Sequence, residues 1–238
     1  MKIILLAAGR GKRFGRRTQT TPKCLIPIGP GGQNLLRRYF LSFRRLGLQD
    51  VVIVVGHQKE KIIRECARID HGLKVRFIPN EKYTRGSLFS LFKASEELRG
   101  DCLIMDADVY FPIAALRRLV RSRHSSCFLI DPRSKFSGEE MMVMSRNGKP
   151  SLIAKKVDPS LKALGESVGF LKISKTAAEK LKKILKKFVE QGKLDVEYEE
   201  SYNVLMKKTR IGCEKITEFW TEMDFEEDLR VIQRRHRR

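Results

Sequence analysis

Apolar runs that could cross a membrane are missing from this sequence, since none approaches the ~18 residues that a spanning helix needs. The apolar stretch of residues 3–8 is short and leads into basic residues, which argues against a secretory signal. The five cysteines are odd in number, scattered and without a CxxC pair, which argues against a zinc finger or a disulfide framework. These absences favour a protein of the reducing cytoplasm.

Linkers and repeats are missing too. No Pro- or Ser-rich stretch divides the 238 residues, so we expect a single domain with a sizeable core. Acidic residues are scarce, 28 against 49 lysines and arginines, and the net charge is +21. A nucleic-acid or anionic-membrane partner would account for such a charge. We favour solvated helix faces and expect no nucleic-acid partner, because the lysines follow helical spacing without interleaved aromatic residues.

Strand and helix patterns alternate through residue 131. The β-branched apolar run at 51–55 is typical of a buried parallel strand. Apolar residues at helical spacing follow Asn34, a plausible N-cap, and end at Gly47. The rhythm predicts a parallel sheet with helices on both faces and ligands at the carboxyl ends of the strands. The expected strands are 2–6, 51–55, 74–78, 102–105 and 126–130, and the expected helices are 34–46, 59–69, 87–98 and 113–121.

The pattern changes beyond residue 131. Residues 141–145 and 151–154 flank Asn147-Gly148, which predicts a hairpin. The later expected strands are 169–174, 213–217 and 219–223, and the expected helices are 176–191, 195–208 and a final one from Phe225.

A small-residue loop, Ala7-Ala8-Gly9-Arg10-Gly11, follows the first expected strand. Glycines let backbone amides approach a bound group closely, and a row of amides makes an anion cradle. The cations that follow are Lys12, Arg13, Arg16, Arg17 and Lys23. The loop is neither a dinucleotide fingerprint, which needs glycine where Phe14 stands, nor a P-loop, which needs Ser or Thr after the lysine. Amides and cations together still suit a triphosphate.

The segment LAAGRGKR, a short spacer and PKCLIPI closely resemble the signature of the sugar-phosphate and alcohol-phosphate nucleotidyltransferases. The resemblance implies a Rossmann-like three-layer α/β sandwich with a mostly parallel central sheet, in which Arg13 and Lys23 hold the phosphates of a nucleoside triphosphate. The nucleotide-binding residues it implies are Leu6, Ala7, Ala8, Gly9, Gly11, Lys12, Arg13, Lys23, Gly86, Ser87 and Asp106. The alternative, a Gly-rich turn with a solvated basic face, does not account for Pro22-Lys23 at the family distance.

Two acidic motifs follow expected strands. Asp106-Ala107-Asp108 can hold a hard cation or form an Asx-rich turn before Pro112. Residues 220–229, WTEMDFEEDL, resemble the W-x-E-I-D-x-x-E-D-L segment of the same family. The resemblance implies that Asp108 and Asp224 are the ligands of a catalytic Mg²⁺. Asp224 could instead cap a helix with Glu227 as its capping-box partner, and the two roles are compatible.

Three further motifs, KKV at 155–157, GESVGF at 165–170 and DVEYEESY at 195–202, resemble the phosphocholine and inositol-phosphate cytidylyltransferase branch. They imply an acceptor site formed by Lys156, Glu166, Tyr198, Glu199 and Glu200, with Lys155 as the competing choice for the acceptor phosphate. An aromatic ring beside carboxylates also suits a quaternary ammonium. The alternative for both glutamates of the pair is an exposed helix face. RGSLFSL at 85–91 is one residue shorter than the corresponding segment of the branch, which leaves the base preference open.

The resemblance implies a cytoplasmic, Mg²⁺-dependent nucleotidyltransferase that couples a nucleoside triphosphate, CTP by preference, to a small phosphorylated alcohol such as phosphocholine or inositol phosphate. The catalytic residues it implies are Arg13, Lys23, Asp108, Lys156 and Asp224. One rival is a hexose-1-phosphate uridylyl- or thymidylyltransferase. The other is a basic nucleic-acid-binding protein on a degenerate transferase fold, which predicts missing metal aspartates, whereas both are present.

We expect residues 1–134 to bind the nucleotide, 135–210 to bind the acceptor and 211–238 to complete the metal site. The basic residues 234–238, RRHRR, follow the last apolar helical positions and are expected to lie outside the active site. A solvated tail is the simpler interpretation, and weak peripheral attachment to an anionic membrane is the alternative. The sequence indicates no particular oligomeric state.

Overall fold

The computed structural model describes the backbone of residues 1–236 and the side chains of residues 1–235. The strands are β1 (Lys2–Ala7), β2 (Asp50–Val55), β3 (Lys74–Pro79), β4 (Cys102–Asp106), β5 (Val109–Tyr110), β6 (Cys127–Asp131), β7 (Met142–Arg146), β8 (Lys149–Ala154), β9 (Lys162–Ile173), β10 (Gly212–Lys215) and β11 (Thr221–Glu222). The α-helices are α1 (Arg17–Thr20), α2 (Leu35–Arg45), α3 (Lys59–Arg68), α4 (Ser87–Lys93), α5 (Ile113–Val120), α6 (Lys175–Glu190), α7 (Glu199–Met206) and α8 (Glu226–His236).

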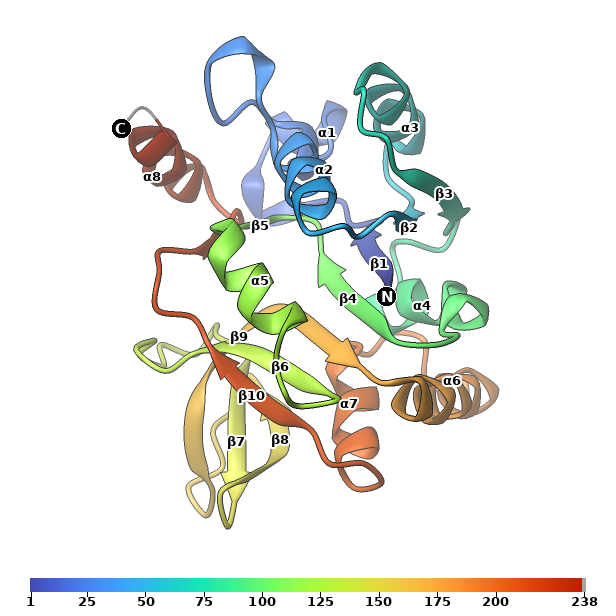
Figure 1. The fold of residues 1–238 in the computed structure, drawn as a ribbon, viewed down its shortest axis with the longest axis vertical. Helices are drawn as coiled ribbons and strands as arrows, with labels where there is room; N and C mark the ends of the chain where they lie inside the picture. The colour runs from blue at the N-terminus through green and yellow to red at the C-terminus, as the bar shows by residue number, and fades with distance from the viewer. Residues whose placement is uncertain (237–238) are drawn as a thin grey trace.

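The central sheet has the strand order β10-β6-β9-β4-β1-β2-β3 (Figure 1). Strands β4, β1, β2 and β3 are all parallel, and β10 is parallel to β6. The predicted α/β sandwich with a mostly parallel sheet is therefore confirmed. The β7–β8 hairpin packs beside β9 and turns at Asn147 and Gly148, both with positive φ, as the sequence predicts.

Strand β9 departs from the expectation in length and direction. It begins at Lys162, not at Gly169, and runs antiparallel between β4 and β6. The sequence does not predict residues 162–168 as strand, because polar residues and Gly165 interrupt the apolar pattern there. The reversed direction has a consequence for the site. It brings the first half of β9, which carries Glu166, to the edge where the parallel strands have their carboxyl ends.

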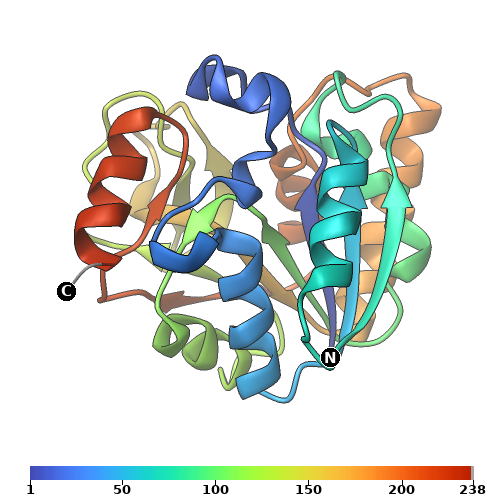
Figure 2. The ribbon, with the colours of Figure 1, turned by 90° about the horizontal axis from the view of Figure 1, so that it is seen from above.

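Helices cover both faces of the sheet (Figure 2). Alternate residues of a strand point to opposite faces, so Ile3 and Leu5 of β1 pack into one cluster and Ile4 into the other. The first cluster contains buried residues of α2, α3, α5 and α8, and the second contains those of α4, α6 and α7. Two apolar layers thus hold the strand ends, and the loops that follow them, in fixed positions.

A local signal explains where α2 begins, and a tertiary contact explains where α7 begins. The Asn34 side chain accepts a hydrogen bond from the amide of Arg37, at 2.9 Å, and caps α2 as expected. Helix α7 begins at Glu199 and not at the expected residue 195, because the amides of Gly86 and Leu88 bond the carbonyls of Leu194 and Val196. The segment before α7, residues 194–196, is therefore a strap held across the start of α4.

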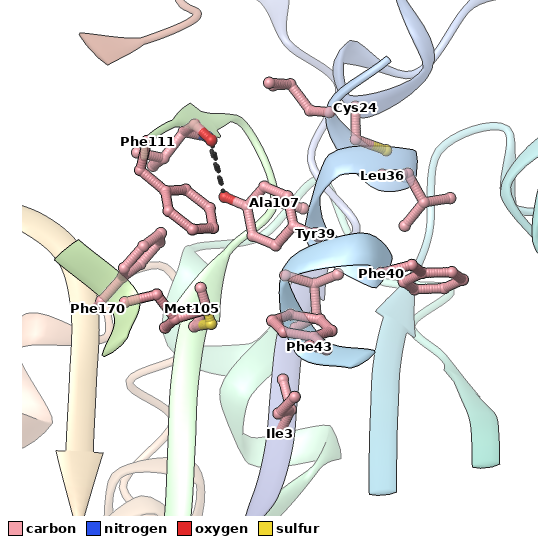
Figure 3. Packing of buried hydrophobic residues seen from close by; sticks show 14 of the residues in the cluster. Ile3, Cys24, Leu36, Tyr39, Phe40, Phe43, Met105, Ala107, Phe111 and Phe170 are labelled. Atoms are coloured by element: carbon pink, nitrogen blue, oxygen red, sulfur yellow. Dashed lines mark hydrogen bonds between the residues drawn. The ribbon is translucent and has the colours of Figure 1, made fainter. Parts of the chain in front are cut away.

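Tyr39 of α2 anchors the loop after β4. Its ring packs edge-on against Phe111 and Phe170, with centroid distances of 4.9 and 6.3 Å (Figure 3). Its hydroxyl donates to the carbonyls of Asp106, at 2.6 Å, and Val109, at 3.0 Å. The buried hydroxyl thus holds the backbone on both sides of Asp108 and fixes the path of the loop at 106–109.

No helix in residues 1–236 is long and apolar enough to cross a membrane. The basic end of the chain begins inside α8, where the Arg235 guanidinium lies over the Phe219 ring at 4.4 Å. Arg237 and Arg238, which belong to the expected basic tail, lie outside the described residues.

Candidate active site

The loop after β1 is shaped around the Lys23 side chain. Gly11 has φ +63°, and a Cβ at that position would lie 2.9 Å from Lys23 Cγ. The hydroxyl of Thr18 closes the loop by hydrogen bonds to the carbonyls of Gly11, at 2.8 Å, and Gly15, at 3.0 Å. The glycine therefore allows the lysine to pass beneath the loop and reach the carboxylates on its far side.

Two carboxylates converge on that lysine. Lys23 Nζ lies 2.7 Å from Asp108 Oδ2 and 2.5 Å from Asp224 Oδ1. Arg13 Nη2 lies 2.6 Å from the other oxygen of Asp224. Arg13 and Lys23, the expected phosphate ligands, thus form one cluster with the two expected metal ligands. In the sequence, 201 positions separate Lys23 from Asp224.

A short antiparallel pair brings the aspartates together. Strand β5 follows Asp108, and β11 precedes Asp224, with Glu222 opposite Val109. The amide of Met223 donates to the carbonyl of Asp108 at 2.9 Å. The capping box expected from Glu227 is replaced, because the Asp228 carboxylate accepts from the amides of Asp224 and Phe225, at 2.9 and 2.7 Å. The Asp224 carboxylate therefore faces the cations and not its own helix.

The electrostatic balance of the cluster differs from group to group. Burial alone would lower the pKa of Lys23, but Asp108 and Asp224 raise it above its ordinary value. Burial alone would raise the pKa of Asp224, but Lys23 and Arg13 hold it below its ordinary value. Burial and the two aspartates raise the pKa of Glu222 to about 8. The cluster thus has an excess of acidic groups over cations.

Asp106 lies deeper than its neighbour in the motif. Burial and the charge of Asp108 raise its pKa well above the ordinary value, and Tyr198 Oη donates to its Oδ2 at 2.5 Å. A Cβ on Gly169 would lie 2.5 Å from that same oxygen. Glycine at that position of β9 thus leaves space for the carboxyl group, and the acidic motif is connected directly to the segment that precedes α7.

These groups line a cavity of about 660 Å³ at the carboxyl ends of the strands. Its wall in the described chain carries eleven acidic and four basic residues, although the protein as a whole is strongly basic. The acidic ones are Asp106, Asp108, Asp131, Glu139, Glu140, Glu166, Glu197, Glu199, Glu222, Asp224 and Asp228, and the basic ones are Arg13, Lys23, Arg85 and Lys155. A smaller hollow of about 260 Å³ adjoins Lys23 beneath the loop and is lined by Ala7, Gly11 and Lys12, among others.

Most of the nucleotide-side residues expected from the sequence meet here. Leu6, Ala8, Gly9 and Ser87 line the larger cavity. Gly86 is not among the lining residues, since it packs against the strap before α7, where a Cβ would lie 2.3 Å from the carbonyl oxygen of Val196. Its placement supports a packing function.

On the acceptor side, the structure distinguishes between neighbouring residues. Glu166, Tyr198 and Glu199 line the cavity, whereas Glu200 is exposed, because successive helical residues point about 100° apart. The expected Lys156 is not among the lining residues. Lys155, the competing choice, lines the cavity and lowers the pKa of Glu199 by its charge, although burial raises that pKa overall, to about 7.

Several wall residues were not expected from the sequence. Asp131 ends β6 as Asp106 ends β4, so the rule that placed Asp106 at the ligand edge applies to Asp131 as well. Trp220 begins the motif at 220–229, from which the sequence predicts only Asp224 as a site residue. Glu222 stands in the same motif, and Tyr83 lies ahead of the short segment at 85–91, but the sequence indicates no role for either.

The donor set at Lys23 fits a divalent cation. Asp108 and Asp224 direct one oxygen each at a single cationic atom, the ammonium nitrogen. Mg²⁺ is commonly held by one or two carboxylates, with phosphate and water oxygens completing its shell. Within the described residues, no group of three or more His, Cys, Asp or Glu side chains forms a metal cluster. The protein would therefore supply two ligands and the substrate the others.

Comparison with known proteins matches residues 3–184 to the family described as the MobA-like NTP transferase domain. The chain is 25% identical over 229 residues to a bifunctional IPC transferase and DIPP synthase of Aquifex aeolicus, a match that covers 95% of this chain and 49% of that protein. It is 33% identical over 152 residues to a choline-phosphate cytidylyltransferase of Haemophilus influenzae, covering 63% and 60% respectively. The chain thus spans about half the length of these curated relatives.

The fold is also found among solved structures. A CTP:phosphocholine cytidylyltransferase from Streptococcus pneumoniae superposes with a TM-score of 0.75 at 22% identity, over 99% of this chain and 98% of that one. The resemblance noted in the sequence is therefore confirmed at the level of family and fold.

Proposed function

This chain belongs to the MobA-like NTP transferase family and is similar to choline-phosphate cytidylyltransferases, and we propose that it is a Mg²⁺-dependent cytidylyltransferase. It joins the CMP part of CTP to a small phosphorylated alcohol and releases pyrophosphate. Residues 1–134 bind the nucleotide, 135–210 contribute the acceptor side, and the chain from 211 onward completes the metal site.

The observation that carries the proposal is the convergence of Asp108 and Asp224 on Lys23 beside the glycine loop. A triphosphate in the loop would place its negative charge next to Lys23 and Arg13. Both cations then have phosphate oxygens as partners, and the two carboxylates become available to a metal. The same four side chains thus serve the substrate-free and the loaded enzyme.

The reaction needs charge control more than proton transfer. The acceptor's phosphate has a second pKa of about 6, so its attacking oxygen is already ionised at neutral pH and requires no general base. Mg²⁺, when bound, supplies neutralisation of the phosphate charge and orientation of the phosphates for in-line displacement. Arg13 and Lys23 stabilise the charge that develops on the departing pyrophosphate. Lys155, which lines the same cavity, draws in the acceptor's phosphate.

The acceptor that the cavity suits best carries a positive charge. In addition to the two aspartates that pair with Lys23, the cavity wall contains Glu166, Glu199 and Glu222. Burial raises the pKa of each of these glutamates. A raised pKa means that the ionised form lacks stabilisation, which a bound cation would provide. An amino-alcohol phosphate such as phosphocholine is therefore favoured over inositol phosphate or a hexose phosphate, both of which carry neutral hydroxyl-rich heads.

Pyrophosphate release tests the proposal. The purified protein with Mg²⁺ is offered CTP, UTP, ATP, GTP and dTTP, each with phosphocholine, inositol phosphate, aminoethylphosphonate and glucose 1-phosphate. We expect the highest kcat/KM with CTP and one of the two cationic acceptors. Turnover confined to UTP or dTTP with the hexose phosphate would replace the proposal by the rival uridylyl- or thymidylyltransferase.

A further inference from the structure

The buried Asp131 carboxylate makes four hydrogen bonds at the end of β6. Its Oδ1 accepts from the backbone amide and Nε of Arg133, both at 2.9 Å. Its Oδ2 accepts from Arg133 Nη2 and from Trp220 Nε1, again at 2.9 Å. The carboxylate therefore has no strong lone pair left for a substrate, although it lies on the cavity wall.

Arg133 extends the contact to the chain on which Trp220 stands. Its Nη1 and Nη2 donate to the carbonyls of Thr217, at 2.7 Å, and Glu218, at 3.1 Å. One guanidinium thus ties the end of β6 to the backbone ahead of the tryptophan, while Asp131 holds the indole edge. A planar fork with several fixed donors orients its partners more strictly than an ammonium could.

Trp220 lines the cavity together with the acidic residues of the acceptor side. It lines the same cavity as Glu166, which is opposite Asp131 in the β6–β9 register, and it comes two residues before Glu222. The indole is half-buried against the first apolar cluster, and its one polar group, Nε1–H, is bonded to Asp131, so the surface that it offers to the cavity is aromatic. A tryptophan face beside carboxylates attracts an organic cation.

We propose that Asp131, locked by Arg133, is a positioning residue that fixes the Trp220 indole as the wall for the acceptor's cationic head and so sets acceptor specificity. This inference rests on the proposed function for its acceptor class. Asp131 acts through the indole and touches no reacting atom.

The chain offers a direct probe, because Trp220 is its one tryptophan. Its fluorescence in the intact 238-residue chain reports binding without turnover. We would titrate the wild type with phosphocholine and with 3,3-dimethylbutyl phosphate, which has the same shape and no positive charge on the head. We expect phosphocholine to change the emission and to bind more tightly than its neutral isostere.

Asp131→Asn replaces one carboxylate oxygen by an NH₂ group. That group would face N–H donors of Arg133 or Trp220 and cannot accept from them, so the hydrogen-bonded support of the indole is lost. We expect the Kd and KM for phosphocholine to rise about tenfold, the scale of a lost cation–π contact, with little change for the isostere, for kcat or for the KM of CTP. Arg133→Lys, which keeps the charge and loses the fork, should give a smaller rise and covers the case in which Asp131→Asn does not fold.

Arg118→Gln is the matched control. Arg118 anchors the same stretch of chain through Glu218 and the Lys215 carbonyl, at 2.9 and 3.0 Å, and neither Arg118 nor Glu218 is among the residues that line the cavity. It should lower stability and leave acceptor binding unchanged. If the KM for phosphocholine rose equally in Arg118→Gln and Asp131→Asn, a general loosening of the chain around residues 215–220 would explain both effects. That result would overturn the inference.

A double-mutant cycle completes the test. Because Asp131 acts through the indole, Asp131→Asn should have under a twofold effect on the phosphocholine KM in a Trp220→Phe background, and additive effects would contradict the inference. A wild type without pyrophosphate release for any acceptor would refute the proposed function. The fluorescence titration would still test the inference in that case. Equal affinity for phosphocholine and its isostere, or an unchanged affinity for phosphocholine in Asp131→Asn, would overturn it.

Discussion

Replacement of Lys23 by methionine should destabilise the metal-free protein and make it responsive to Mg²⁺. The Lys23 ammonium is the partner shared by Asp108 and Asp224, and the side chains of Lys23 and Asp224 are only 13% and 11% exposed. Without it, the two carboxylates are left near Glu222, and among the described residues Arg13 is the cation that still pairs with one of them, Asp224. Methionine fills similar volume, so the loss is electrostatic and not a cavity effect.

The magnitude follows from the burial of the pair. Breaking a fully buried ion pair costs about 3–5 kcal/mol, and since Asp108 is 32% exposed we expect about 2–4 kcal/mol. For a protein of this size that corresponds to a fall in Tm of roughly 4–16 °C. A metal that binds the freed carboxylates with a Kd of about 1 mM would return about 1.4 kcal/mol at about 10 mM Mg²⁺.

Thermal and urea unfolding of wild type and Lys23→Met, each with EDTA or with Mg²⁺, measures both effects. Lys182→Met is the control, because Lys182 pairs with Glu96 at 2.6 Å on the surface, where such pairs contribute at most about 1 kcal/mol. Equal stability of Lys23→Met and wild type in EDTA would refute the reasoning. So would an identical Mg²⁺ response of the two proteins, because the lysine would then not compete with the metal.

Three further changes test other parts of the site. Burial raises the pKa of Glu199 to about 7, against about 4.3 in the unfolded chain, so the folded state loses stability as the pH rises between these values. In urea titrations at pH 5 and pH 8, the free energy of unfolding of Glu199→Gln should fall by about 1–3 kcal/mol less than that of the wild type. Equal losses in the two proteins would contradict the burial argument. Lys155→Ala should raise the KM for the acceptor at least tenfold in pyrophosphate-release kinetics while Lys156→Ala stays within twofold, and the reverse order would return the assignment to Lys156. Gly11→Ala places a methyl group 2.9 Å from Lys23 Cγ at positive φ, so it should lower the free energy of unfolding by about 1–3 kcal/mol and weaken CTP binding in calorimetry, and wild-type values for both would show that the loop can adapt.

Much of the fold follows from local patterns. The run at 51–55 is β-branched and apolar throughout, as a strand buried on both faces must be, and it forms β2. The antiparallel placement of β9 could not be predicted in this way. Its outer half is polar because it borders the cavity, and its position between β4 and β6 depends on pairings with residues far away in sequence.

The same division holds for the candidate site. The glycine loop, Asp108 and Asp224 stand in extended motifs that can be recognised in the sequence by their resemblance to a family, and the structure brings them together. The choice between Lys155 and Lys156 depended on which side of the chain after β8 meets the cavity, which spacing does not determine. Asp131 and Trp220 meet across 89 positions, and no sequence pattern connects them.

Pyrophosphate release by Asp108→Asn and Asp224→Asn tests the central claim most directly. Each variant would be assayed with CTP and phosphocholine at saturating Mg²⁺, with circular dichroism and unfolding curves as the check that the fold persists. Loss of one charged ligand from a site with two carboxylates should reduce kcat/KM at least about a thousandfold, since several kcal/mol of transition-state stabilisation are lost. Folded variants with activity near that of the wild type would contradict the assignment of these two aspartates to the metal and with it the proposed mechanism.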